Sequence, residues 1–140
     1  MGCYVDTSVL VAYYLPERQS ARVQQMLTRL ETATISALVE VEFCSALSRK
    51  VRMRHLSRTA ARQVLGMFRA HLADGLYHQV TLTRREFDLA SDWLADFSSS
   101  LRTLDALHLA AAFTHEMKLL TADATLATAA RSVGVRIQKL

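Results

Sequence analysis

Two spacings of apolar residues alternate along this chain. Short apolar or alternating segments predict β-strands, because successive side chains of a strand point to opposite faces of a sheet. Longer segments with apolar residues three and four positions apart predict helices with one apolar side. The expected strands cover 3–5, 34–36, 76–82, 118–121 and 135–137. The expected helices cover the VLVAYYL segment that Pro16 ends, 17–30, 37–53, 57–74, 83–97, 106–116 and 124–132.

Polar residues at the expected helix starts support these boundaries. Ser57, Thr83, Thr103 and Asp123 stand where side chains cap helix N-termini, and Gly75 stands where a helix ends. Strands that alternate with helices predict an α/β fold, here a three-layer α/β/α sandwich around a mostly parallel sheet of short strands. Only four Gly and one Pro interrupt the chain. We therefore expect one domain over residues 1–140.

Composition indicates the cellular compartment in which we expect the protein. No apolar run approaches the ~18 residues of a membrane span, and the N-terminal segment meets Asp6 too early for a signal peptide. Cys3 and Cys44 lie in separate apolar segments and form no Cys-x-x-Cys pair, which predicts buried free thiols rather than structural zinc. We therefore expect a soluble protein of the reducing cytoplasm.

Four carboxylates interrupt apolar or small-residue segments, namely Asp6, Glu42, Asp105 and Asp123. Two carboxylates within ~4 Å of each other repel by roughly 4 kcal/mol at an effective dielectric of about 20, and burying an unpartnered one is costly. A divalent cation offsets both costs, and carboxylate and water ligands suit Mg²⁺ or Mn²⁺. If the fold brings the four together, they form a metal site suited to phosphodiester hydrolysis.

The charge on the rest of the chain suits a polyanionic substrate. The chain has 17 Lys and Arg against 13 Asp and Glu, for a net charge of +4. With the four candidate acids set aside, nine acids remain against 17 basic residues, so the rest of the chain carries +8. An acidic site on a basic body suits a metal-dependent enzyme that acts on nucleic acid.

The same acids have a simpler interpretation as helix caps. Asp6 and Asp123 follow expected strands and Asp105 lies in the first turn of a helix, so each is also placed to satisfy helix amides. Asp6 and Asp123 nevertheless lie beyond the carboxyl ends of strands, where ligands of open α/β sheets bind. Glu42 lies inside its helix, where capping does not apply, but Glu40 has similar apolar neighbours. Periodicity alone does not choose between these two glutamates.

Four motifs, in order along the chain, carry a family resemblance. They are Asp6-Thr-Ser after the first strand, Val41-Glu42-Phe43 between Ser36-Ala-Leu and Ser45-Ala46-Leu47, Leu101-Arg102-Thr103-Leu104-Asp105-Ala106-Leu107-His108-Leu109-Ala110, and Leu120-Thr121-Ala122-Asp123. Together they resemble the PIN-domain family, and more narrowly the VapC toxins of bacterial and archaeal toxin–antitoxin pairs. The likeness spans essentially the whole chain.

This resemblance implies a Mg²⁺- or Mn²⁺-dependent endoribonuclease that is usually a homodimer and is held inactive by a cognate antitoxin. It implies that Asp6, Glu42, Asp105 and Asp123 are the acidic site residues, and so selects Glu42 over Glu40. We expect Asp6 and Asp105 to be the main metal ligands, with the other two acids completing the site directly or through waters.

Residues next to these acids are less specific candidates for a role in the site. Thr7, Ser8 and Thr121 are candidates to hydrogen-bond the site carboxylates or their waters, although helix capping and turn bonds explain them equally well. Arg102 is a candidate contact for a phosphate or an antitoxin carboxylate. We expect His108 to be a packed, hydrogen-bonded histidine of the core. The densest basic run, formed by Arg49, Lys50, Arg52 and Arg54, suits RNA backbone but also an ordinary solvated helix end.

Two other classes of function stay open. An aspartyl-phosphate phosphatase or signalling receiver uses an aspartate such as Asp6 as its nucleophile. Against it, position 8 is Ser where a second acid is expected, and Lys118 is the only lysine near an expected site edge. A catalytically idle PIN-fold binding module uses the same acids to cap helices or contact a partner. A nucleotide-binding enzyme is disfavoured because the four glycines never cluster into a phosphate loop.

Overall fold

The computed structural model describes residues 2–140, which contain a five-stranded sheet. Its strands are β1 (Cys3–Val5), β2 (Ala33–Ser36), β3 (Tyr77–Val80), β4 (Lys118–Leu120) and β5 (Ile137–Gln138). They lie in the order β3-β2-β1-β4-β5, and every neighbouring pair is parallel. The sheet expected to be mostly parallel is parallel throughout the described chain. The carboxyl ends of its strands therefore share one edge.

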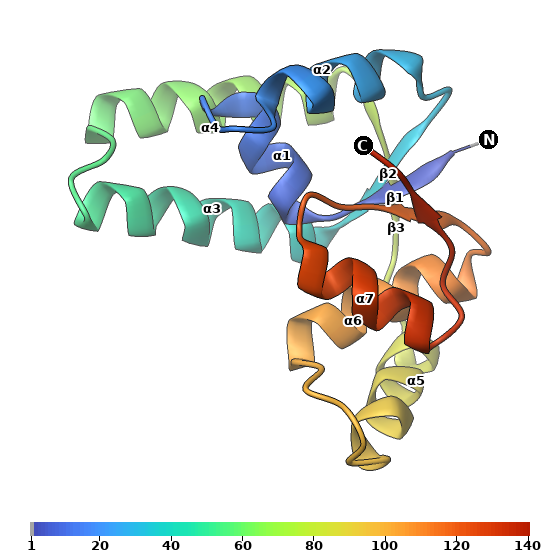
Figure 1. Cartoon of the computed structure of the whole chain (residues 1–140). Helices are drawn as coiled ribbons and strands as arrows, with labels where there is room; N and C mark the ends of the chain where they lie inside the picture. The colour runs from blue at the N-terminus through green and yellow to red at the C-terminus, as the bar shows by residue number, and fades with distance from the viewer. Residues whose placement is uncertain (1) are drawn as a thin grey trace.

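Helices fill the connections between the strands. They are α1 (Thr7–Tyr14), α2 (Ser20–Arg29), α3 (Ala37–Arg52), α4 (Arg58–Ala73), α5 (Arg84–Ala95), α6 (Thr103–Thr114) and α7 (Ala124–Ser132). Figure 1 shows α2 and α4 on one side of the sheet and α5, α6 and α7 on the other, so the expected three-layer α/β/α sandwich is confirmed. None of the helices in residues 2–140 is long and apolar enough to cross a membrane.

Several helices begin or end at the capping residues that the sequence predicted. The Ser57 hydroxyl accepts a hydrogen bond from the Ala60 amide at the start of α4 (3.1 Å). Gly75 follows α4 with a φ of 75°, a left-handed conformation that glycine adopts without strain. Thr83 and Glu86 form a capping box at the start of α5. These helices therefore begin and end within a few residues of their expected bounds.

The expected start of α6 was wrong. Thr103 is the first residue of the helix rather than its cap, and Arg102 holds the N-cap position without a side-chain cap. The Ala106 amide donates to the Arg102 carbonyl (2.9 Å), which is the first hydrogen bond of the helix. No Gly or Pro in this segment disfavours a helix that begins here. Asp105 consequently lies within the first turn of α6.

Other boundaries also differ from expectation, since β3 covers Tyr77–Val80 rather than 76–82 and α5 ends at Ala95 rather than at 97. Helix α2 begins at Ser20 rather than at 17, because the Ser20 hydroxyl accepts from the Glu17 amide (2.8 Å) and donates to the Leu15 carbonyl (3.0 Å), which holds the intervening residues in a turn. Strand β5 lies one to two residues later than expected, since the Arg136 carbonyl is the first to bond β4, at the Leu119 amide (2.8 Å).

Helix α6 is the centre of the core on its side of the sheet. Every residue from Ala106 to Ala112 is buried, because α6 packs against β1 and β4 on one face and against α5 on another. Small residues such as Ala106 and Ala110 permit this close approach to Ala90 of α5. Its N-terminal end, with Asp105, is left at the carboxyl edge of the sheet.

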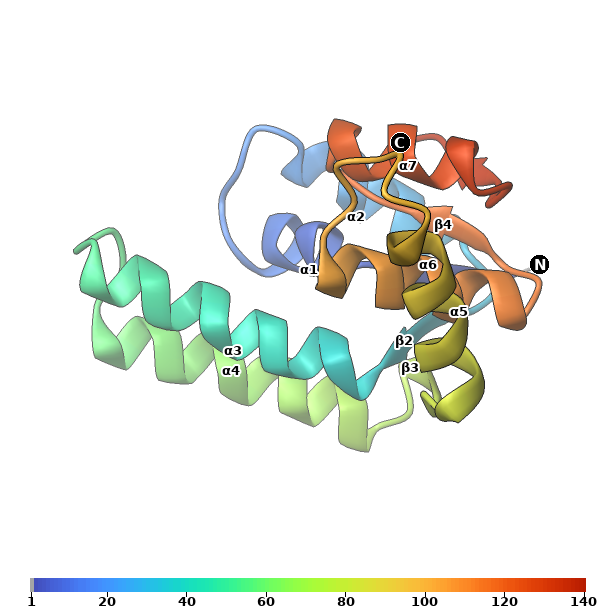
Figure 2. The same cartoon turned by 90° about the horizontal axis from the view of Figure 1, so that it is seen from below.

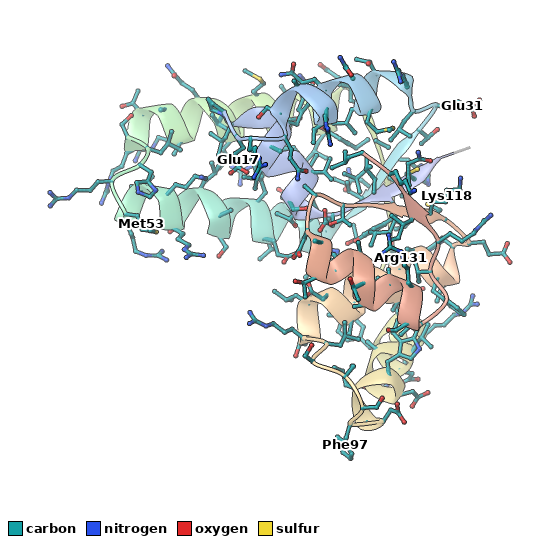
Figure 3. The ribbon with its side chains drawn as sticks, viewed as in Figure 1. Glu17, Glu31, Met53, Phe97, Lys118 and Arg131 are labelled. Carbon is teal, nitrogen blue, oxygen red and sulfur yellow. The ribbon has the colours of Figure 1, made fainter. Side chains whose placement is uncertain are left out.

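Helices α3 and α4 form a long antiparallel hairpin that extends away from the sheet (Figures 1 and 2). Figure 3 shows Met53 at the far end of this hairpin. Arg54 in the turn has a φ of 58°, which lets the chain reverse between the two helices. The half of α3 nearer the sheet carries Glu42 and the far half carries the basic run.

Candidate active site

The carboxyl edge of the sheet collects the four acids that the sequence singled out. Asp6 directly follows β1, and Asp123 caps α7 just beyond β4. Asp105 lies in the first turn of α6, and Glu42 lies in the second turn of α3. Parallel strands and short connections therefore place all four near one edge of the sheet.

Asp6 is the most deeply buried of the four, with 5% of its surface exposed. Its Oδ1 accepts a hydrogen bond from the Ser8 hydroxyl (2.7 Å) and its Oδ2 accepts one from the Thr121 hydroxyl (2.9 Å). Burial raises the pKa of Asp6 to about 6, although the Ser8 bond, the nearby His108 and the Thr121 bond all act to lower it. An ionised Asp6 is thus costly in this protein without a cation nearby.

Glu42 is half-buried and faces the same edge. The Thr7 hydroxyl donates to its Oε1 (3.0 Å), and His108 Nε2 bonds the same oxygen. Burial on its own would raise the pKa of Glu42, but the hydrogen bond and charge of His108 and the bond from Thr7 hold it below its usual value. Glu40 faces elsewhere, since its carboxylate lies 3.9 Å from Arg69 on α4.

Asp105 and Asp123 are close enough to influence each other. Burial raises the pKa of Asp105, and the negative charges of Asp123 and Glu42 add to that rise, while His108 and Arg102 oppose it. Asp123 also caps α7, with its Oδ1 accepting from the amides of Thr125 (2.8 Å) and Leu126 (3.3 Å). Capping and membership of an acidic cluster are therefore both true of Asp123.

The acids are grouped but are not arranged around a cation. Among residues 2–140, no three or more His, Cys, Asp or Glu side chains form a ready metal-binding set. Protein donors reach both oxygens of Asp6, Oε1 of Glu42 and Oδ1 of Asp123, and each of these carboxylate oxygens has a second lone pair. The donor set is all carboxylate, which fits a hard cation such as Mg²⁺ or Mn²⁺. Such an ion would find the carboxylate of Asp105, Oε2 of Glu42 and Oδ2 of Asp123 without a hydrogen-bond partner in the described chain.

His108 is the residue of this site whose role the sequence did not reveal. It is 2% exposed and hydrogen-bonded to the Tyr4 hydroxyl through Nδ1 (2.8 Å), so the expected core histidine is confirmed. Its other nitrogen bonds Glu42, which is 66 residues away in the chain. No spacing in the sequence links these two positions, since only the packing of α3 against α6 brings them together.

A groove of about 730 Å³ is lined by two of the four acids, Glu42 and Asp123, whereas Asp105 lines a separate pocket. Its lining also includes the hydroxyl residues Thr7 and Ser8, apolar residues, and the basic side chains of Arg18, Arg49, Lys50 and His55. The basic run on α3 is thus divided. Arg49 and Lys50 line this groove, whereas Arg52 lines a separate pocket between α3 and α4 and donates to Ser48 (2.9 Å). Lys50 pairs with Glu17 (3.4 Å), which lies above α3 in Figure 3.

Solved structures share this fold at low sequence identity. VapC20 of Mycobacterium tuberculosis, described as a sarcin–ricin loop cleaving toxin, is 17% identical with a TM-score of 0.72, over 91% of this chain and 94% of that one. FitAcB of Neisseria gonorrhoeae is 17% identical with a TM-score of 0.71, over 99% and 97%. VapBC2 of Rickettsia felis, bound to a DNA fragment from its promoter, is 13% identical with a TM-score of 0.69, over 99% and 98%.

At these identities the structural likeness concerns the fold. A search of curated proteins found no match to this sequence. A sequence model of the PIN domain, in contrast, matches residues 3–132. Because this match covers nearly the whole chain and the fold agrees with it, the protein belongs to the PIN domain family.

Proposed function

We propose that this protein is a Mg²⁺- or Mn²⁺-dependent endoribonuclease and the toxin of a toxin–antitoxin pair. The observation that carries the proposal is the grouping of Asp6, Glu42, Asp105 and Asp123 at one sheet edge, where the charges of Asp123 and Glu42 act on Asp105. Acids that repel one another in the absence of metal are typical of a site that a cation completes. Membership of the PIN domain family and the toxins of the same fold support this assignment.

In this proposal each acid has a role. Asp6 and Asp105 are the main metal ligands, and Glu42 and Asp123 complete the site directly or through waters. Thr7, Ser8 and Thr121 orient the carboxylates through the hydrogen bonds that they donate. A bound divalent ion would lower the pKa of a coordinated water and offset negative charge on the phosphorane.

The substrate is a polyanion, and the residues around the acids suit one. The groove beside Glu42 and Asp123 presents Arg18 and Arg49, neither of which forms an ion pair within residues 2–140. Arg102, at the N-terminus of α6, acts on Asp105 electrostatically and is placed to contact a phosphate or an antitoxin carboxylate. An RNA strand therefore finds cations on the approach to an acidic cleavage site.

The wider assignment includes a cognate antitoxin, a homodimer and action in the cytoplasm. One structure of the same fold is described as a toxin–antitoxin complex from Klebsiella pneumoniae, and VapBC2 was solved with a DNA fragment from its promoter. The antitoxin of this protein should be encoded by an adjacent small gene. Co-expression of the two products should yield a stable complex without ribonuclease activity.

Metal dependence is tested by removing and restoring the ion. Chelator should abolish cleavage of RNA, and Mn²⁺ should raise the melting temperature of the native protein by ligand linkage. Asp6→Asn and Asp105→Asn should each remove the Mn²⁺-induced shift and the activity while leaving the chain folded. Ribonuclease activity that persists in excess chelator would contradict the proposal.

An aspartyl-phosphate enzyme is disfavoured by the positions of Asp6 and Lys118. Asp6 is only 5% exposed, which leaves little room for a phosphoryl group to reach its oxygens. Lys118, labelled in Figure 3, begins β4 and pairs with Cys3, so it lies at the amino ends of the strands, whereas Asp6 follows the carboxyl end of β1. Covalent phosphate on Asp6 would revive this alternative, and Mn²⁺ binding without RNA cleavage would favour the idle binding module.

A further inference from the structure

A buried chain of hydrogen bonds leads from the sheet to Glu42. The Ser36 hydroxyl of β2 bonds the Tyr4 hydroxyl of β1 (2.8 Å), and that hydroxyl bonds His108 Nδ1 on α6 (2.8 Å). His108 Nε2 then bonds Oε1 of Glu42 on α3. Ser36, Tyr4 and His108 are 1%, 0% and 2% exposed, so the chain runs through the core. Four separate elements therefore meet in one polar network.

We propose that His108 is a positioning residue that fixes the Glu42 carboxylate, with Oε1 held by the protein and Oε2 presented to the groove. The inference rests on the proposed nuclease function and goes further, because it assigns each oxygen of Glu42 a different task. Glu42 then supplies a single oxygen to a cation or to a cation-bound water. His108 touches neither RNA nor the reacting atoms, and acts only through Glu42.

The chemistry of the two side chains determines which atom donates in the hydrogen bond between His108 and Glu42. A carboxylate oxygen such as Oε1 of Glu42 only accepts hydrogen bonds, here from His108 Nε2. Nε2 must therefore carry the proton and donate, which is possible for both the neutral Nε2–H tautomer and the imidazolium. The Tyr4 hydroxyl serves either form, since it donates to an unprotonated Nδ1 or accepts from a protonated one. His108 Nε2 can thus donate to Oε1 in both forms of the ring.

Oε1 of Glu42 has a second donor. The Thr7 hydroxyl also donates to Oε1 (3.0 Å), so this oxygen has two donors from two helices. Oε2 has no hydrogen-bond partner among residues 2–140, and Glu42 lines the groove beside the acids. Loss of the His108 donor would free the carboxylate to rotate about its last torsion, for which several orientations are accessible. Buried polar networks of this kind fix geometry because each member is held by the next.

The test compares variants that remove or preserve the donor. His108→Met has a similar volume without a polar hydrogen, and should lower kcat and Mn²⁺ affinity by about 10- to 100-fold with KM for RNA nearly unchanged. His108→Gln carries an amide nitrogen near the position of Nε2 and should restore most of both. Tyr4→Phe should have a smaller effect, because His108 remains but loses its anchor. His78→Met, at an exposed histidine of β3, is the matched control and should behave as wild type.

Nitrogen NMR of the metal-free wild-type protein gives a result that does not depend on activity or on variants folding. The ring of His108 should carry a proton on Nε2, seen as a bonded ¹H–¹⁵N pair protected from exchange. An unprotonated Nε2 would overturn the inference, as would a folded His108→Met variant with wild-type kcat and Mn²⁺ affinity. If the wild-type protein cleaves no RNA with Mn²⁺ present, the proposed function fails, while the NMR and Mn²⁺ affinity measurements still decide whether His108 positions Glu42.

Discussion

Two glutamates that lie two positions apart in α3 face different parts of the molecule. Residues two apart in a helix point about 200° away from each other, so Glu40 and Glu42 cannot both face the groove. Glu42 bonds Thr7 and His108, whereas Glu40 lies near Arg69 with 38% of its side chain exposed. The pair therefore offers a matched comparison in which the same chemical change is made in two environments.

We predict opposite outcomes for Glu42→Gln and Glu40→Gln. Glu42→Gln should abolish RNA cleavage and weaken Mn²⁺ binding. It should change the metal-free melting temperature little, because losing the charge that repels Asp105 offsets losing the charge that His108 and Thr7 stabilise. Glu40→Gln should keep turnover within a few-fold of wild type. Metal-titrated cleavage and melting curves with and without Mn²⁺ measure both. An inactive Glu40 variant beside an active Glu42 variant would show that α3 presents the other glutamate to the substrate.

At the scale of single elements, Asp123 combines a cap and a site acid. Its Oδ1 accepts two amides of α7, while Oδ2 has no hydrogen-bond partner in residues 2–140. An asparagine keeps a side-chain oxygen for the cap but removes the negative charge. The two tasks are therefore separable by substitution.

Asp123→Asn should preserve stability and lose Mn²⁺ affinity and activity. Asp123→Ala should lose the same functions and should also lower the free energy of unfolding by about 1 kcal/mol, since α7 loses its N-cap. Urea unfolding of both variants, in chelator, separates the effects. Full activity in Asp123→Asn would show that the carboxylate serves α7 alone.

Glu86 holds the start of α5 against the end of α6. Its carboxylate accepts from the amide and hydroxyl of Thr83 (both 2.7 Å) and from the Thr114 hydroxyl (2.6 Å). Burial alone would raise the pKa of Glu86, but the bonds from Thr114 and Thr83 outweigh it and lower the pKa to about 2. The ionised group is thus stabilised in the native state.

Glu86→Gln should destabilise the protein by about 1–3 kcal/mol near neutral pH, because an amide cannot accept at every position that the carboxylate fills. The folded pKa of about 2 lies below the ordinary value of 4.5, so ionised Glu86 stabilises the fold above about pH 4.5 and this contribution is lost as pH falls toward 2. Unfolding free energies of wild type and variant should therefore converge below pH 4.5. A difference that stayed constant down to pH 2 would argue against the lowered pKa.

Over the whole molecule, charge is separated between the acidic edge and the basic body. Arg49 lines the groove beside the acids and Arg52, one turn later on α3, does not. Both are exposed arginines of one helix, so truncating either has similar consequences for the helix itself. A difference between them in RNA binding then reports on the groove.

RNA affinity in chelator should fall steeply with added salt, because phosphate contacts release counterions. About three contacts to a single strand correspond to a slope near −2 for the logarithm of affinity against the logarithm of salt concentration. Arg49→Ala should weaken binding and make this slope shallower by about 0.7, whereas Arg52→Ala should leave both near wild type. Titrations of a short RNA at several salt concentrations measure the slope. A salt-independent affinity, or equal losses for the two variants, would exclude the groove as the docking surface.

Local interactions made most of the secondary structure predictable. Ser57, Thr83 and Asp123 cap their helices through bonds to residues two or three positions away, so the sequence itself contains the cause. The alternation of strands and helices likewise determined the α/β class, since parallel strands need crossover connections. The start of α6 was mispredicted because a plausible cap at Thr103 competed with a segment that continues helically from Arg102.

The sequence by itself also determined which acids are unusual, since each interrupts an apolar or small-residue stretch, and the family resemblance chose Glu42 over Glu40. Only tertiary structure decided what those acids contact. Glu42 meets His108 across 66 residues, and Tyr4 meets His108 across 104, through the packing of α3 and β1 against α6. Such contacts depend on how whole elements pack, and packing follows the shape of the complete core rather than any local pattern.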